Sequence, residues 1–228
     1  MGFGVLRRSN GFLNSWSNRA SLEIINISLV CDGSSDKCLE QIVYPLIDLH
    51  FPHLTCRIVA AGEVIPATEP LARRLVKTWE LYQPHIILCH RDAEREQWST
   101  RQAEIVTASE NLSVPTIPIV PVRMLESWLL LDAQAIRAAA NNRNGTVALN
   151  LPRPGEIEGL PDPKEVLFDI LRRASDLPPQ RLRRFREHEA RSRVAGFIAD
   201  VTILRILPAF TQFEASFCDA MTSVGNQA

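Results

Sequence analysis

Residues 23–36 of the chain read EIINISLVCDGSSD. Residues 23–31 are mostly apolar and several are β-branched, which predicts a buried strand, and Asp32-Gly33-Ser34-Ser35 predicts the turn that ends it. Apolar residues then recur at helical spacing between Leu39 and Ile47, so a helix is expected to follow, with Ser34 or Ser35 as its cap. A strand, a tight turn and a helix in this order form the first half of a βαβ unit.

The same alternation continues along the chain. Further strands are predicted at 55–60, 86–89 and 116–120, and the remaining helices of this part at 66–82, 97–110 and 123–140. Strands that alternate with helices indicate an α/β domain with a parallel sheet of about four strands. The strand at 86–89 is apolar throughout, as expected of a strand that helices cover on both faces.

The chain divides into three predicted regions. Residues 1–20 lack a long apolar stretch and are expected to be a disordered leader rather than a secretory signal. Residues 21–150 form the α/β domain, which ends in a loop at 141–150. Residues 151–228 are rich in Pro and Arg and form a helical extension packed on that domain, with helices expected at 164–174, 191–207 and 209–221.

Composition limits the class of protein. Apolar residues make up 46% of the 228, which suffices for a core, and the formal net charge of −1 gives no bulk basicity. The five cysteines include no CxxC pair, so a zinc site is not expected and the thiols are interpreted as reduced. No apolar stretch is long enough for a membrane span. A cytoplasmic protein is therefore predicted.

Carboxylates stand where the predicted strands end. Asp32 follows the first strand, Asp92 and Glu94 follow the third, and Glu126 begins the helix after the fourth. The carboxyl ends of parallel strands line one crevice, so these acids are expected to meet there. Clustered carboxylates without His or Cys suit a hard cation such as Mg²⁺ or Mn²⁺. Each acid also has a structural interpretation, as a turn residue, a solvated charge or a helix-start charge.

Two further acids have weaker claims to the same site. Asp36 lies at a helix start, where it would complement the helix dipole. Asp132 is interpreted mainly as a surface acid.

The ordered motifs resemble the TOPRIM fold of topoisomerases, primases and nucleases of the overcoming-lysogenization-defect type. The resemblance rests on Asp32-Gly33-Ser34-Ser35-Asp36 and on Asp92-Ala93-Glu94. The stretches PVRMLESWLLLD at 121–132 and IEGLPDPKEVL at 157–167 are similar to one prokaryotic branch, domain of unknown function 4276. The end of the chain, 193–210, matches more loosely.

This resemblance implies a divalent-metal-dependent phosphodiesterase, expected to be a nuclease of phage defence or mobile elements that acts beside a partner ATPase. Asp32, Asp92, Glu94 and Glu126 would hold Mg²⁺ or Mn²⁺ and carry the catalysis. However, the fold usually has Glu at the position of Asp32 and Asp at the position of Glu94. The alternative is therefore a catalytically degenerate binding or regulatory subunit of a larger complex. A phosphotransfer or nucleotide-processing enzyme on the same fold is a third, weaker option.

Basic residues supply the candidate phosphate contacts. His90, Arg91 and Lys164 are predicted to contact phosphate, although each could equally make a structural hydrogen bond or ion pair. Eight arginines against three acids lie between Arg172 and Arg193. Such a basic face suits nucleic acid, since Arg binds phosphate in a bidentate manner, and the alternative is a pair of solvated helices.

Overall fold

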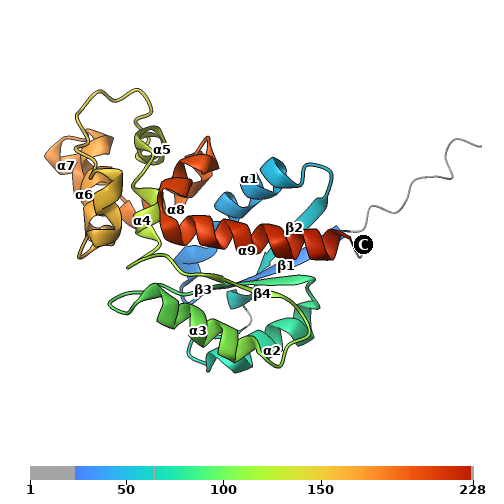
Figure 1. Cartoon of the computed structure of the whole chain (residues 1–228). Coiled ribbons are helices and arrows are strands. Elements are labelled where there is room, and N and C mark those ends of the chain that lie inside the picture. The colour runs from blue at the N-terminus through green and yellow to red at the C-terminus, as the bar shows by residue number, and fades with distance from the viewer. Residues whose placement is uncertain (1–23, 64, 227–228) are drawn as a thin grey trace, which may run out of the picture.

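The computed structural model describes residues 24–226 apart from residue 64, so the predicted leader lies outside the described residues. Its centre is one four-stranded, all-parallel sheet of order β2-β1-β3-β4 (Figure 1). The predicted α/β fold with a parallel sheet is confirmed. The strands are β1 (Ile24–Val30), β2 (Thr55–Ala60), β3 (Ile86–His90) and β4 (Thr116–Ile119).

Apolar residue pairs and the His85 side chain fix the register of the two inner strands, β1 and β3. Ile27 lies opposite Ile58 of β2 on one side and Ile86 of β3 on the other. At the amino end of β3, the backbone N–H of Asn26 donates to Nδ1 of His85 at 2.9 Å, and the His85 N–H donates to the Asn26 carbonyl at 2.8 Å. Residues 86–89 of β3 are buried, as their continuous apolar sequence predicts, and His90 at the end of the strand is buried as well.

β4 is an edge strand with a proline at its centre. Pro118 lies opposite Cys89 of β3. The Arg91 N–H donates to the Ile119 carbonyl, so the backbone groups of Ile119 face β3 and those of Pro118 face the outer edge. Proline has no N–H to donate and is tolerated in a sheet at such an edge.

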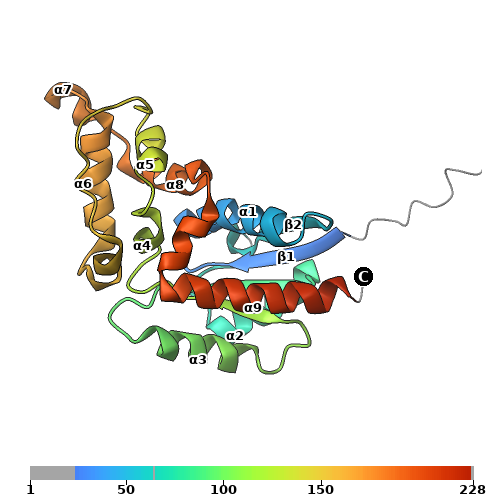
Figure 2. The same cartoon turned by 45° about the horizontal axis from the view of Figure 1, so that its top comes forward.

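Helices cover both faces of the sheet (Figure 2). On one face, Leu75 of α2 and Ile105 of α3 pack against Ile87 and Cys89 in a small buried cluster. On the other face, a larger cluster joins the sheet to α1, α8 and α9. These helices are α1 (Glu40–His50), which follows the 3₁₀ turn η1 (Ser34–Leu39), α2 (Leu71–Tyr82), α3 (Trp98–Ser109), α8 (Glu187–Phe197) and α9 (Pro208–Gly225).

The helical extension shares that larger core with the sheet. Trp128 of α4 is fully buried and meets Phe210 of α9 edge-to-face, with ring centroids 5.1 Å apart. Phe213 and Phe217 of α9 continue the aromatic cluster. The predicted boundary at residue 150 stays a prediction, although buried contacts run across it. The other elements here are α4 (Glu126–Leu129), α5 (Ala133–Ala139), η3 (Pro154–Gly159), α6 (Pro163–Ser175) and α7 (Pro179–Leu182).

Two predicted helices are interrupted by aspartates. The helix expected at 123–140 is α4 followed by α5, because Asp132 leaves helical geometry and its carboxylate accepts the N–H groups of Gln134 and Ala135. The helix expected at 191–207 is α8 followed by the 3₁₀ turn η4 (Val201–Ile206), because Asp200 caps Thr202 in the same way. Aspartate favours such caps over helix interiors, and helical periodicity does not reveal the break.

Among the described residues, none of the helices combines the length and the apolarity needed to cross a membrane. All five cysteines lie in the described part of the chain, and all are free thiols. Burial raises the pKa of the Cys89 thiol to about 12 and that of Cys38 to about 11, which keeps both protonated at neutral pH. These thiols therefore behave as core residues, as the sequence suggested.

Candidate functional site

The carboxyl ends of β1 and β3 form the topological switch point of the sheet. From β1 the chain crosses to β2 on one side, and it then returns to β3 on the other side of β1. Ligands of open α/β sheets bind in the crevice at this point. Asp32 follows β1 and Asp92 follows β3, so the prediction that they stand beyond neighbouring strands is confirmed.

Two arginines pair with Asp32. Nη1 of Arg74 lies 2.7 Å from Oδ1 of Asp32, and Nε of Arg91 lies 3.1 Å from Oδ2. Arg74 is almost fully buried and also donates to the Cys31 carbonyl. Burial acts to raise the pKa of Asp32, but the hydrogen bonds from Arg74 and Arg91 outweigh it, so the pKa lies below its usual value. Asp32 is therefore an ionised, doubly paired carboxylate.

Arg191 of α8 holds two other carboxylates of the expected site. Its Nε lies 3.0 Å from Oε1 of Glu126, and its Nη2 lies 3.0 Å from Oδ1 of Asp36. Its Nη1 also donates to the Ser35 carbonyl at 2.6 Å. The side chains of Arg191 and Glu126 are only 4% and 5% exposed, so this ion pair lies in the protein interior. We call Asp36, Glu126 and Arg191 the buried triad.

His90 lies between two of the same acids. Its Nε2 is 3.3 Å from Oδ1 of Asp92, and its Nδ1 is 3.6 Å from Oδ2 of Asp36. Burial lowers the pKa of His90, but Asp92, followed by Asp36 and Asp32, raises it by more, so the pKa lies above 6.5. A protonated His90 would add a fourth cation to this group of carboxylates.

Asp92 and Glu94 have fewer close ionic contacts than Asp32 and Glu126. Oδ1 of Asp92 accepts the backbone N–H of Leu125 at 2.9 Å, which connects the end of β3 to the start of α4. The Glu94 side chain is 67% exposed, and its Oε2 lies 4.0 Å from Nη2 of Arg101. Glu94 is thus the most accessible of the four predicted ligands.

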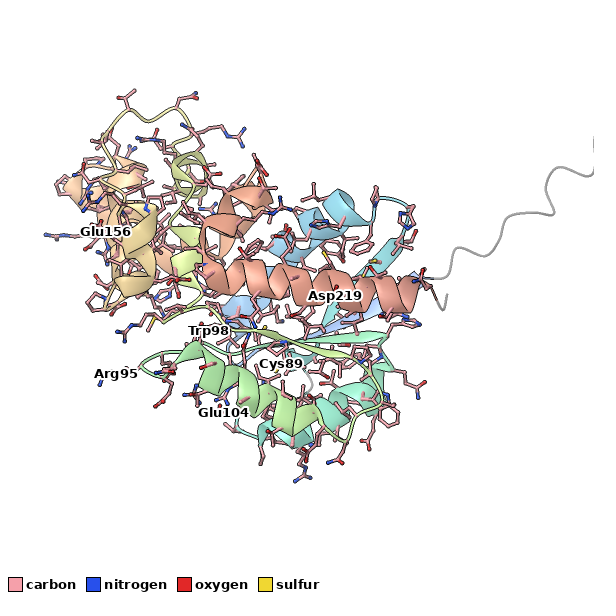
Figure 3. The ribbon with its side chains drawn as sticks, viewed as in Figure 1. Cys89, Arg95, Trp98, Glu104, Glu156 and Asp219 are labelled. Atoms are coloured by element: carbon pink, nitrogen blue, oxygen red, sulfur yellow. The ribbon has the colours of Figure 1, made fainter. Side chains whose placement is uncertain are left out.

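The other candidates have mainly structural contacts. Arg91 pairs with Glu104 at 2.7 Å as well as with Asp32, and Figure 3 shows Glu104 on α3, on the side of the sheet away from α9. Asp132 caps α5. Nζ of Lys164 lies 5.9 Å from the ring centroid of Phe168 on the same helix. The predicted phosphate contacts of His90, Arg91 and Lys164 stay predictions.

The predicted carboxylates lie along one edge but do not assemble into a ligand set. Within residues 24–63 and 65–226, no group of three or more His, Cys, Asp or Glu side chains is placed to hold a metal ion. Asp32 and Glu126 instead accept hydrogen bonds from arginines. In this arrangement the residues do not fit a divalent ion, and metal binding stays a prediction.

Arg74 and Arg191 were not among the residues predicted for this site. Both lie on the buried stripe of an amphipathic helix, Arg74 next to Leu75 on α2, and Arg191 between Ala190 and Val194 on α8. A charge at an apolar position of a helix is costly unless it is paired. That conflict is the signal in the sequence that could have revealed them.

Comparison with known proteins identifies no relative of this chain. No family model, no curated protein and no solved structure matches the chain. The resemblance to TOPRIM proteins therefore stays an expectation that rests on the motifs at 32–36 and 92–94 and on the stretches at 121–132 and 157–167. Since one fold serves many activities, the function has to be argued from the site itself.

We predict that Arg191→Met lowers the free energy of unfolding by about 3–5 kcal/mol, because Asp36 and Glu126 would stay buried without their counter-ion. Urea denaturation at neutral pH measures the change. The matched control is Arg186→Met in the turn before, where the side chain is 77% exposed and a loss below about 1 kcal/mol is expected. Equal losses in the two variants would contradict an energetic role for the buried triad.

A second prediction concerns pH. Because the pKa of His90 is raised in the folded protein, protonation of His90 stabilises the fold fully below pH 6.5, and this contribution is lost as the pH rises through the raised value. The advantage of the wild type over His90→Gln should therefore shrink as the pH is increased above 6.5. Denaturant midpoints across that range measure it, with exposed His53→Gln as the control. A constant difference between wild type and His90→Gln would refute the prediction.

Proposed function

We propose that this chain is a TOPRIM-like binding or regulatory subunit that contacts nucleic acid, rather than an enzyme with a preformed metal centre. One observation carries the proposal. Two of the four carboxylates expected to hold a metal already have arginine partners from the chain itself, Asp32 with Arg74 and Arg91, and Glu126 with Arg191. Asp32 and Glu126 are therefore neutralised without an ion.

The chemistry of arginine supports this interpretation. A guanidinium group stays charged at any pH that a folded protein tolerates, so it cannot release its carboxylate by deprotonation. A metal ion would have to displace Arg191 from a buried position and leave that cation without a partner, which costs several kcal/mol. Asp36 and Glu126 are therefore better described as structural residues than as ligands.

The nucleic-acid part of the proposal rests on the helical extension. Arg181, Arg183 and Arg184 are exposed at and just after α7, which Figure 1 shows at the outer end of that extension. In the part of the chain that the structure describes, their side chains have no hydrogen bond or ion pair. We call these three residues the arginine tip. The other five arginines of the basic stretch have protein partners, namely Arg172, Arg173, Arg186, Arg191 and Arg193.

We predict that reversing the arginine tip, Arg181→Glu/Arg183→Glu/Arg184→Glu, weakens binding of the chain to DNA or RNA by at least about tenfold. Each phosphate contact adds about 0.9 to the slope of log affinity against log salt on duplex DNA, so the slope should fall by about 3. Fluorescence anisotropy over a salt series measures both quantities. Arg57→Glu, a substitution of an exposed arginine on β2, is the control. Unchanged affinity and slope in the triple variant would remove nucleic acid from the proposal.

The second candidate is a Mg²⁺- or Mn²⁺-dependent phosphodiesterase. It is favoured by the position of Asp32 and Asp92 at the switch point, and by the 67% exposure of Glu94. A metal ion held there would activate water and neutralise charge in the transition state. This candidate requires Arg74 and Arg91 to release Asp32.

A Mn²⁺ titration separates the two candidates. For the binding subunit we predict no change in melting temperature up to millimolar Mn²⁺. A metal centre would stabilise the native state by RT ln(1 + [L]/Kd), about 2.7 kcal/mol at a hundredfold excess over Kd, and Asp92→Asn would abolish the gain. Such an Asp92-dependent shift, together with nucleic-acid cleavage that Asp92→Ala removes, would replace the first candidate by the second.

A further inference from the structure

A cavity of about 440 Å³ lies beside the switch point, at the carboxyl ends of β3 and β4. Its walls come from the loop between β3 and α3, the turn between β4 and α4, and the segment before α6. Its lining has three arginines and three acids beside two apolar residues, namely Arg95, Arg101, Arg123, Glu94, Glu96, Asp162, Met124 and Pro161. Its volume is in the range of sites for small molecules rather than for whole proteins.

The two loops that form the cavity are joined by their backbones. The Glu94 N–H donates to the Arg123 carbonyl at 2.7 Å, and Nη1 of Arg123 donates to the Glu94 carbonyl at 3.3 Å. Both residues have left-handed backbones, with φ of 53° for Glu94 and 65° for Arg123, which side chains other than glycine rarely adopt. Such conformations persist where the surroundings impose them, and they are common at ligand sites.

The charges lining the cavity are not all matched. Nη1 of Arg101 lies 2.9 Å from Glu104, so that guanidinium has an internal partner. Among the described residues, the Arg123 side chain is bonded only to a carbonyl, and the exposed side chain of Arg95 has no hydrogen bond or ion pair. Figure 3 shows Arg95 at the tip of the loop before α3. Of the three acids, Asp162 accepts the Glu165 N–H as the cap of α6, and Oε2 of Glu94 lies 4.0 Å from Nη2 of Arg101. The third, Glu96, is exposed.

Two arginines without a carboxylate partner, beside an apolar wall, indicate the ligand. Guanidinium groups bind phosphate oxygens in a bidentate, charge-assisted manner. Met124 and Pro161 offer an apolar surface for an organic group attached to that phosphate. We propose that Arg95 and Arg123 bind the phosphate of a nucleotide-sized phosphate monoester. This inference rests on the proposed function, because it takes the carboxyl edge of the sheet as the ligand-binding face.

The same chemical group has two sources, a free nucleoside monophosphate and the phosphorylated end of an oligonucleotide. The test is calorimetric titration of the full chain in EDTA with a nucleoside monophosphate, the matching nucleoside, and a trinucleotide with and without a 5′-phosphate. We expect the monophosphate to bind at least about tenfold more tightly than the nucleoside. Tighter binding of the phosphorylated trinucleotide than of the monophosphate identifies a nucleic-acid end as the source, and the reverse order identifies a free nucleotide.

Variants locate the binding site. Arg95→Gln and Arg123→Gln should each weaken monophosphate binding about tenfold, and Arg57→Gln should leave it unchanged. Arg95 is exposed, so its variant tests the site even if Arg123→Gln impairs folding. Absence of binding by the wild type at millimolar monophosphate, equal affinity for the nucleoside, or full affinity in Arg95→Gln would overturn the proposal. Because the titration contains EDTA, its outcome does not depend on the Mn²⁺ experiment. Because the variants keep the arginine tip intact, the outcome does not depend on the salt-series experiment either.

Discussion

The buried ion pairs of Arg191 are the interaction on which the arrangement of this protein depends. Asp36 comes from the turn after β1, Glu126 from the start of α4 and Arg191 from α8, so one guanidinium joins segments that are far apart in the sequence. Charges in an interior must be paired or the structure loses several kcal/mol. The helical extension therefore cannot leave the sheet without exposing an apolar face and separating these charges.

Charge pairing extends to other acids at the same edge of the sheet. Asp32 has two arginines, and His90 lies between Asp36 and Asp92. Acids that would attract a cation in isolation are thus occupied within the fold. The unmatched charges lie further out, in the arginine tip and in the cavity between the loops that follow β3 and β4. The arginine tip carries positive charge, which favours phosphate over metal as its ligand, whereas the cavity is lined by three arginines and three acids.

Local sequence patterns predicted the strands of the sheet correctly, but they did not predict the ion pairs between side chains. Four strands and the order of the helices around them follow from apolar runs and turn residues, which act locally. The interruptions at Asp132 and Asp200 were not predicted, because an aspartate that caps a helix lies within an unbroken helical pattern. The positions of Asp32 and Asp92 beyond neighbouring strands were predicted from the rule for parallel sheets. The arginine partners of the acids at this edge were not predicted. Arg74 reaches Asp32, and Arg191 reaches Asp36 and Glu126, only after the helices have packed on the sheet.

The proline in β4 determines how copies of this chain can meet. An exposed strand edge is a template for a strand of another molecule, and aggregation often begins by such pairing. Along the outer edge of β4, Pro118 presents a ring where an N–H donor would be needed, so the row of hydrogen bonds that an incoming strand requires is broken at its centre. Growth of the sheet from one molecule into the next by strand pairing along β4 is thereby disfavoured.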